Sequence, residues 1–258
     1  MMIESLLKRG KIMKLSVCVD ALYRGEDIFK SLEKIKASGY DEFEFWSWWD
    51  KDIERLQEIK ERLDMTVTTF CTKFISLVDP DQRERYIRGL EESIMVAKKL
   101  GCKQLITQTG NDTHKSKDEQ QRSLIEGLKA CVPILEANDM TLLVEPLNIH
   151  IDHKGYYLDS SAEAFEIIDK VGSENVKVLF DIYHQQVMGE DIIGSIRNNL
   201  DKIGHFHAAG VPGRNELYYG ELDYSVIFKE IDGLEFSGYI GLEYFPKDDP
   251  EIGLKRES

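Results

Sequence analysis

The chain has 258 residues, 42% of them hydrophobic, and a formal net charge of −14 at pH 7. By length alone the chain could form one or two domains, and a single α/β barrel commonly has ~250 residues. The hydrophobic content is enough for a full core. The acidic balance argues against a nucleic acid or anionic membrane partner, because phosphate contacts need a basic face. No uncharged apolar stretch approaches the roughly 18 residues of a membrane span, and residues 1–13 lack the apolar centre of a signal peptide. We therefore expect a cytoplasmic protein with a small-molecule substrate, and a homo-oligomer stays open.

Short apolar runs alternate along the chain with helix-like segments, which is typical of an α/β fold with a parallel sheet. Eight strands close a (β/α)8 or TIM barrel, so we predict one such barrel over residues 14–258. Met13 directly precedes the first strand, and residues 1–13 are predicted to be an N-terminal extension. The predicted strands are Leu15–Val19, Glu42–Phe45, Thr66–Phe70, Gln104–Thr107, Thr141–Val144, Val176–Phe180, Ile203–Phe206 and Tyr239–Leu242.

The segments between the strands carry apolar residues at helical spacing. Gly39 and Gly101 stand where helix C-caps belong, each shortly before the next strand. After Glu243 only a short final helix fits, so the last position of the ring is predicted to be incompletely covered. The predicted helices are Asp27–Ala37, Asp52–Leu63, Glu84–Leu100, Asp118–Ala137, Ala162–Val171 and Tyr224–Ile231.

The cysteines are widely spaced and form no CxxC pair. This usage fits a reducing compartment, where free cysteines behave as small apolar residues. We predict buried free thiols at all four positions, Cys18, Cys71, Cys102 and Cys131.

Four successive apolar runs end on a residue that can bind a divalent metal: Glu145, Asp181, His207 and Glu243. Each is separated from the next by about the ~30 residues of one strand-helix-strand unit. The four side chains are therefore expected at the same end of four parallel strands, which in a closed barrel is the catalytic face. Three carboxylates and one imidazole suit Mn²⁺, Mg²⁺ or Co²⁺. Taken alone, each acidic residue is more typical of a helix N-cap or a solvated loop, but several uncompensated carboxylates repel one another unless a cation lies among them.

An ordered set of motifs accompanies these four residues and extends across nearly the whole chain. On this set the chain resembles the hydroxypyruvate isomerase family of the xylose isomerase-like barrels. The motifs are Phe43-Glu-Phe-Trp46, Gly110-Asn111, Glu145-Pro-Leu-Asn148, Gly155-Tyr-Tyr-Leu158, Asp181-Ile-Tyr-His184, His205-Phe-His207, Val211-Pro-Gly-Arg-Asn-Glu216, Gly220-Glu-Leu222 and Gly241-Leu-Glu-Tyr-Phe-Pro246.

The resemblance implies that Glu145, Asp181, His207 and Glu243 hold a divalent cation and that Glu145 and Glu243 also exchange protons with the substrate. Such a pair suits the movement of a carbonyl between adjacent carbons, which needs a base, an acid and a stabilised enediolate. The position of His207 often carries Gln in the isomerases and His in the related ketose 3-epimerases. The chain also departs from many relatives after the third strand, where Cys71-Thr-Lys-Phe-Ile-Ser76 replaces a Gly-Asp-Trp loop.

Four further residues are predicted to bind the substrate. The resemblance suggests that His184, in the loop after Asp181, bonds a substrate oxygen, with a backbone-bonded loop histidine as the alternative. Arg214 follows the His207 strand and can grip a carboxylate bidentately, whereas its alternative is a solvated surface arginine. Asn111 and Trp46 complete the predicted substrate contacts, and for Trp46, Trp48 and Trp49 a subunit contact is the alternative to a wall of the pocket.

His205 shares the inward side of its strand with His207 by two-residue alternation. Two interpretations stay open for it, namely contact with the metal ligands and ordinary filling of the barrel.

The sequence thus predicts a metal-dependent isomerase of hydroxypyruvate or a close oxo-acid. A 2-oxotetronate isomerase or a ketose 3-epimerase is the near alternative, since both would use the same metal and glutamates. A nuclease acting on abasic DNA is a second class, which the −14 charge opposes. A non-catalytic carbohydrate-binding protein is a third class, but binding alone does not need two proton-transfer groups.

Overall fold

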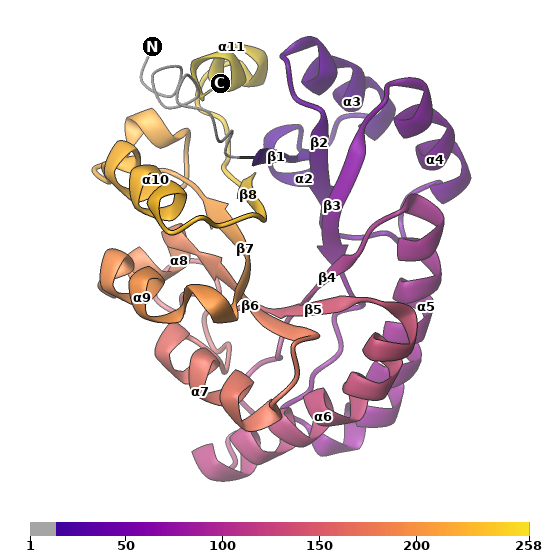
Figure 1. Ribbon diagram of the computed structural model, residues 1–258, viewed down its shortest axis with the longest axis vertical. Coiled ribbons are helices and arrows are strands. Elements are labelled where there is room, and N and C mark those ends of the chain that lie inside the picture. The colour runs from indigo at the N-terminus through magenta and orange to yellow at the C-terminus, as the bar shows by residue number, and fades with distance from the viewer. Residues whose placement is uncertain (1–13, 258) are drawn as a thin grey trace.

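The structure is a computed structural model that describes residues 14–257, so the predicted extension of residues 1–13 lies outside it. Within the described residues, strands β1 to β8 form a closed parallel barrel in sequence order, and the main helices surround it (Figure 1). Pairing of β8 with β1 closes the ring, with Leu15 opposite Ile240. The predicted (β/α)8 barrel is therefore confirmed.

The strands agree with their predicted positions to within two residues at each end. Val19, predicted as the end of the first strand, instead begins helix α2. The strands are β1 Lys14–Cys18, β2 Glu42–Phe45, β3 Thr66–Cys71, β4 Gln104–Thr107, β5 Thr141–Val144, β6 Val176–Asp181, β7 Ile203–Ala208 and β8 Tyr239–Leu242.

All of the predicted helices are present, and the structure adds α2, α8, α9 and three 3₁₀ turns. The helices are α2 Val19–Leu22, α3 Ile28–Ala37, α4 Ile53–Arg62, α5 Arg83–Leu100, α6 Lys117–Asn138, α7 Ser161–Val171, α8 Ile182–Val187, α9 Ile192–Asn199, α10 Tyr224–Gly233 and α11 Pro250–Glu257, and the 3₁₀ turns are η1 Pro80–Gln82, η2 Leu200–Lys202 and η3 Leu217–Tyr219. Within residues 14–257 no helix combines the length and apolar character needed to cross a lipid bilayer.

Side chains and glycines fix the helix ends. The Asp27 carboxylate accepts hydrogen bonds from the first free amides of α3, those of Phe29 and Lys30. Gly101 ends α5 with a φ of 71°, in the left-handed region that glycine adopts without strain. The short α11 lies between α10 and α3 at the closure of the ring (Figure 1).

The core has two parts. Most buried apolar residues pack between the strands and the surrounding helices. A separate small cluster consists of Cys71, Ile106, Leu143 and Leu179, one residue from each of β3 to β6. Cys71 and Ile106 also line the cavity described below, so this cluster forms the apolar side of the barrel interior. All four cysteines are free and buried, as predicted.

Candidate metal centre and active site

The barrel brings together the four side chains that the sequence predicted as metal ligands. Glu145 and Glu243 directly follow β5 and β8, Asp181 ends β6, and His207 lies in β7 opposite Asp181. One ligand atom from each of the four lies within 4.8 Å of every other, and all four residues are buried. Asp181 is also the N-cap of α8, because its Oδ1 accepts the amide of His184 at 3.0 Å. Asp181 therefore caps α8 and also belongs to the cluster of side chains that could hold a metal ion.

The donor set fits a divalent cation. His207 Nδ1 lies 3.5 Å from Glu145 Oε1, 3.8 Å from Asp181 Oδ2 and 3.6 Å from Glu243 Oε2. This nitrogen is buried and has no hydrogen-bond partner in the described structure. Burial, followed by the charge of Glu243, raises the pKa of Asp181 to about 7. Asp181 is therefore costly to ionise beside Glu243, and a cation between these carboxylates would remove this cost.

Glu243 is held at both of its oxygens. Trp46 Nε1 donates to Oε1 at 2.6 Å, and the guanidinium of Arg214 donates to Oε2. Burial alone would raise the pKa of Glu243, but the charges of Arg214 and His207 hold it below its usual range. Trp46 and Arg214, which the sequence assigned to the substrate, thus contact a predicted metal ligand.

Arg214 is only 7% exposed, which excludes the alternative of a solvated surface arginine. Its guanidinium carbon lies 5.2 Å from the ring centres of both Tyr183 and Phe245. Its Nη1 is 3.8 Å from Asp152 Oδ1, and its Nε is buried with no partner in the described structure. Arg214 therefore keeps one unused donor in a position where it also lines the cavity.

The sequence predicted a loop at His184, but the residue lies in the first turn of helix α8. The backbone amide of Asn148 donates to its Nδ1 at 3.2 Å, so the ring hydrogen is on Nε2. Burial and the charge of Arg214 hold the pKa of His184 well below its ordinary value. The Nε2–H has no hydrogen-bond partner and lies 3.6 Å from Asp181 Oδ2. His184 is thus a neutral donor at the edge of the ligand cluster.

These residues surround a cavity of about 340 Å³. It is lined by Trp46, Cys71, Phe74, Ile106, Gln108, Glu145, Leu147, Asp152, His153, His184, His207, Arg214, Glu243 and Phe245. Asn111 is not brought into this cavity. It is exposed and lines a neighbouring cavity of about 510 Å³, which shares Phe74, Gln108 and His153 with the first.

The sequence missed several residues of the site. Phe74, Gln108, Asp152 and His153 line the cavity from loops or loop-like segments, where periodicity gives no signal. Glu44 was also missed, although it lies within the Phe43-Glu-Phe-Trp46 motif. An acidic residue between two phenylalanines of a barrel strand was the available signal, because a buried carboxylate needs a partner.

Comparisons with known proteins agree with this geometry. Residues 32–258 match the profile of the xylose isomerase-like TIM barrel family. The hydroxypyruvate isomerase of Escherichia coli strain K12 is 30% identical over 95% of this chain and 98% of its own length. The 2-oxo-tetronate isomerase of Cupriavidus necator is 37% identical over 50% of each chain. A crystal structure from Brucella melitensis, titled AP endonuclease family 2, covers 94% of this chain and 97% of its own, with a TM-score of 0.90 and 22% identity.

At 22% identity the Brucella structure bears on the fold alone, whereas the two named relatives are isomerases. The chain therefore belongs to the xylose isomerase-like TIM barrel family and is an isomerase of that superfamily.

Proposed function

We propose that the chain interconverts hydroxypyruvate and 2-hydroxy-3-oxopropanoate, or a close oxo-acid pair, with Mn²⁺, Mg²⁺ or Co²⁺ bound by Glu145, Asp181, His207 and Glu243. The observation that carries this proposal is the convergence of the buried Glu145 and Glu243 on His207 Nδ1, at 3.5 and 3.6 Å, in the wall of the cavity. The similarity to the hydroxypyruvate isomerase of E. coli over almost the whole chain supports the substrate class.

The two glutamates suit the proton transfers of this isomerisation. When bound, a divalent cation supplies stabilisation of the negative charge that develops on two adjacent substrate oxygens. One glutamate accepts the proton from the hydroxymethyl carbon C3 and a proton is returned to the former carbonyl carbon C2, while the hydroxyl proton leaves O3 and a proton is gained by O2. Glu145 and Glu243 reach the cavity from β5 and β8, so removal and delivery need no rearrangement of the protein.

Two unused donors suit the remaining substrate oxygens. His184 Nε2–H and Arg214 Nε are buried and lack partners, and both residues line the cavity. His184 is neutral, so it donates to a developing oxyanion without a competing charge. Arg214 is the cation for the substrate carboxylate. A cavity of about 340 Å³ stands at the lower end of the range of ~300 to 1,000 Å³ for ligand pockets, which favours a small substrate.

A 2-oxotetronate isomerase or a ketose 3-epimerase is the second candidate. The neighbouring cavity of about 510 Å³ favours it, because a longer substrate could extend past Phe74 and Gln108 toward Asn111. The similarity to the 2-oxo-tetronate isomerase of C. necator points the same way.

NMR in D₂O with a panel of three- to six-carbon substrates tests the proposal. Hydroxypyruvate should yield 2-hydroxy-3-oxopropanoate with deuterium at C2, and recovered hydroxypyruvate should carry deuterium at C3. Deuterium at C3 of a ketose, with no change in hydroxypyruvate, would replace the proposal by the epimerase. Absence of deuterium from every substrate would remove the proton-transfer function from this site.

A further inference from the structure

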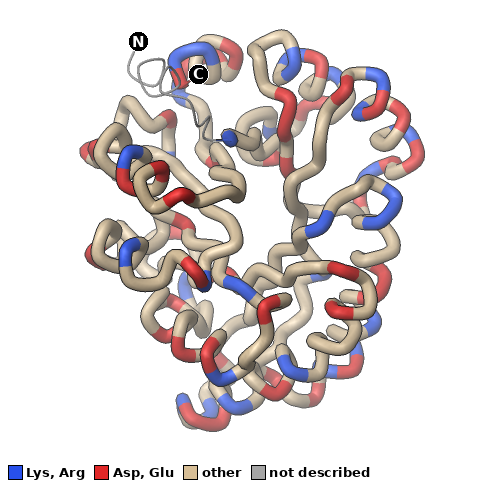
Figure 2. The backbone as a smooth tube through the Cα atoms, in the orientation of Figure 1, with Lys and Arg blue, Asp and Glu red and all other residues tan. Residues whose placement is uncertain are grey.

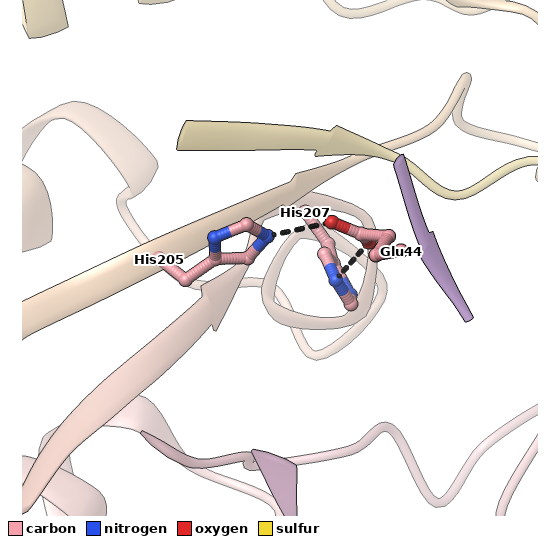
Figure 3. Close-up of side chains that lie close together, drawn as sticks. All are labelled: Glu44, His205 and His207. Carbon is pink, nitrogen blue, oxygen red and sulfur yellow. Dashed lines mark hydrogen bonds and ion pairs between the residues drawn. The ribbon is translucent and has the colours of Figure 1, made fainter. Parts of the chain in front are cut away.

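A buried carboxylate outside the cavity is paired with the proposed imidazole ligand. Glu44 of β2 faces His205 and His207 of β7, and its carboxylate contacts both rings (Figure 3). Glu44 Oε2 is 3.0 Å from His205 Nε2, and Oε1 is 2.8 Å from His207 Nε2. All three residues are at most 1% exposed, and Glu44 is not among the residues that line the cavity.

The barrel is built to allow this contact. β2 and β7 are separated in the sheet by β1 and β8, so the Glu44 side chain must cross the barrel interior to reach β7. Gly241 of β8 lies beside His207 in the register, and a Cβ there would overlap the Glu44 carboxylate and stand 2.7 Å from His207 Cδ2. The glycine therefore leaves the space that the Glu44–His207 pair occupies.

The Glu44 carboxylate is itself held by buried donors. His205 Nε2 donates to Oε2, and the Thr68 hydroxyl donates to the same oxygen at 3.3 Å. Ser16 Oγ is 2.7 Å from that hydroxyl, which fixes its position in turn. Oε2 of Glu44 thus accepts hydrogen bonds from His205 and Thr68, whereas Oε1 contacts His207.

We propose that Glu44 is a positioning residue, which holds the hydrogen of His207 on Nε2 and so presents Nδ1 to the cation. With a cation on Nδ1 the imidazole is neutral and carries one ring hydrogen, and the Glu44 oxygen 2.8 Å from Nε2 favours that hydrogen on Nε2. Nδ1 then keeps its lone pair and faces Glu145, Asp181 and Glu243. A carboxylate behind a ligating histidine fixes the ring orientation and raises its basicity as a ligand. This inference rests on the proposed metal site.

The test is Mn²⁺ binding to the metal-stripped full chain, measured by titration calorimetry in wild type and Glu44→Gln. Glutamine keeps the size of the side chain but offers one acceptor oxygen for two imidazole N–H groups. We expect the Kd for Mn²⁺ to rise by roughly 10- to 100-fold, the usual cost of losing such a partner. Turnover at limiting Mn²⁺ should fall and return toward the wild-type value when Mn²⁺ is raised to saturation.

Two controls separate positioning from general damage. Glu42→Gln makes the same chemical change two residues away on β2 and should leave the Kd within about twofold of wild type. Thr68→Val removes a neutral neighbour of Glu44 but keeps the carboxylate, so its effect should be smaller than that of Glu44→Gln. Damage to packing alone would lower turnover at every Mn²⁺ concentration and would show no rescue.

Gly241→Ala gives a second route to the same result if Glu44→Gln does not fold. Its Cβ displaces the Glu44–His207 pair without removing either group, so it should weaken Mn²⁺ binding in the same way. A Kd within twofold of wild type in the folded variants would overturn the positioning role. If wild type binds no Mn²⁺, Mg²⁺ or Co²⁺, the metal site itself is wrong, and this outcome is recognised before any variant is made.

Discussion

Glu145 and Glu243 differ in how firmly the protein holds their carboxylates. Trp46 and Arg214 each donate to one oxygen of Glu243. The Glu145 side chain contacts the imidazole of His207 and has no comparable pair of donors in the described part of the chain. Glu243 is therefore the more strongly oriented of the two groups, whereas Glu145 keeps more freedom to meet a substrate.

Replacement of either glutamate by glutamine should separate proton transfer from metal binding. The amide keeps an oxygen for the cation but carries no exchangeable acid, so Glu145→Gln and Glu243→Gln should each lower kcat by at least ~10²-fold. Metal content, measured by mass spectrometry, should stay near one ion per chain. His207→Gln should be milder, because it alters a ligand and no proton carrier. An equal loss in His207→Gln and Glu243→Gln would contradict this division of roles.

Arg214 contacts Glu243 and is also proposed to bind a substrate carboxylate. Substitutions at this position can distinguish the two roles. Arg214→Ala should lower kcat/KM for every substrate through Glu243, with a further loss of at least ~10-fold for hydroxypyruvate relative to D-tagatose. Arg214→Lys keeps the charge but loses the planar fork and should lie between wild type and Arg214→Ala. Steady-state kinetics on both substrates make the comparison. Equal losses for acid and sugar would leave Arg214 with the Glu243 contact alone.

The cluster of four side chains that could hold a metal ion was predictable because its signal is local and repeated. Glu145, Asp181, His207 and Glu243 each follow or end an apolar run, and parallel strands place such residues at one end of the barrel. Glu44 could not be assigned in this way, since its contact with His205 joins residues 161 positions apart. The contact depends on the absence of a side chain at Gly241, which no pattern around Glu44 reveals.

The length of a helix decided whether it could be predicted from the sequence. Helices of ten or more residues show several turns of apolar spacing, and all of these were predicted. α2, α8 and α9 have four, six and eight residues, too few for the period of 3.6 to stand out. The misplacement of His184 follows from this, because α8 begins directly at the Asp181 cap.

The C-terminal helix α11 contains a carboxylate that should make stability depend on pH. Glu257 is 3% exposed and accepts the amide of Leu217 at 2.8 Å. Burial raises its pKa from the ordinary 4.5 to about 7. Between these values the folded state binds more protons than the unfolded state, so the free energy of unfolding falls as pH rises. The contribution is up to roughly 3 kcal/mol and is lost by pH 7 and above.

Glu257→Gln should remove this part of the pH dependence, because the amide stays neutral. Urea unfolding at pH 5 and pH 8 should show a smaller difference in Glu257→Gln than in wild type, with the gain in stability at pH 8. Glu251→Gln on the same helix is the matched control and should keep the wild-type difference. A wild-type pH difference that persists in Glu257→Gln would refute this assignment.

At the scale of the whole molecule, the closed ring of β1 to β8 turns distant segments into one site. Basic and acidic residues are interspersed along the outer helices (Figure 2), which suits a surface exposed to water more than a surface for a polyanion. Inside the ring, by contrast, several acidic side chains are buried close together, and burial makes their ionised forms costly in free energy.

Removal of the cation should affect both activity and stability. Exhaustive chelation should abolish turnover, and Mn²⁺, Co²⁺ or Mg²⁺ should restore it. A cation that binds only the folded chain adds about 2.7 kcal/mol at a free concentration of 100 times Kd, which corresponds to roughly 5 to 10 °C in Tm. Thermal unfolding of stripped and reloaded protein measures this shift. Full activity in protein shown to be metal-free would defeat the proposed mechanism.

The four proposed ligands all come from β5 to β8 and the residues that follow them, whereas Phe74, Ile106 and Gln108 line the cavity from the part of the chain that carries β3 and β4. The cavity lining thus has two parts, with His184 and Arg214 beside the proposed ligands and these three residues away from them. Directed evolution can randomise these three positions without touching a ligand or a proton carrier. A new substrate range is therefore reachable by changes confined to one half of the gene.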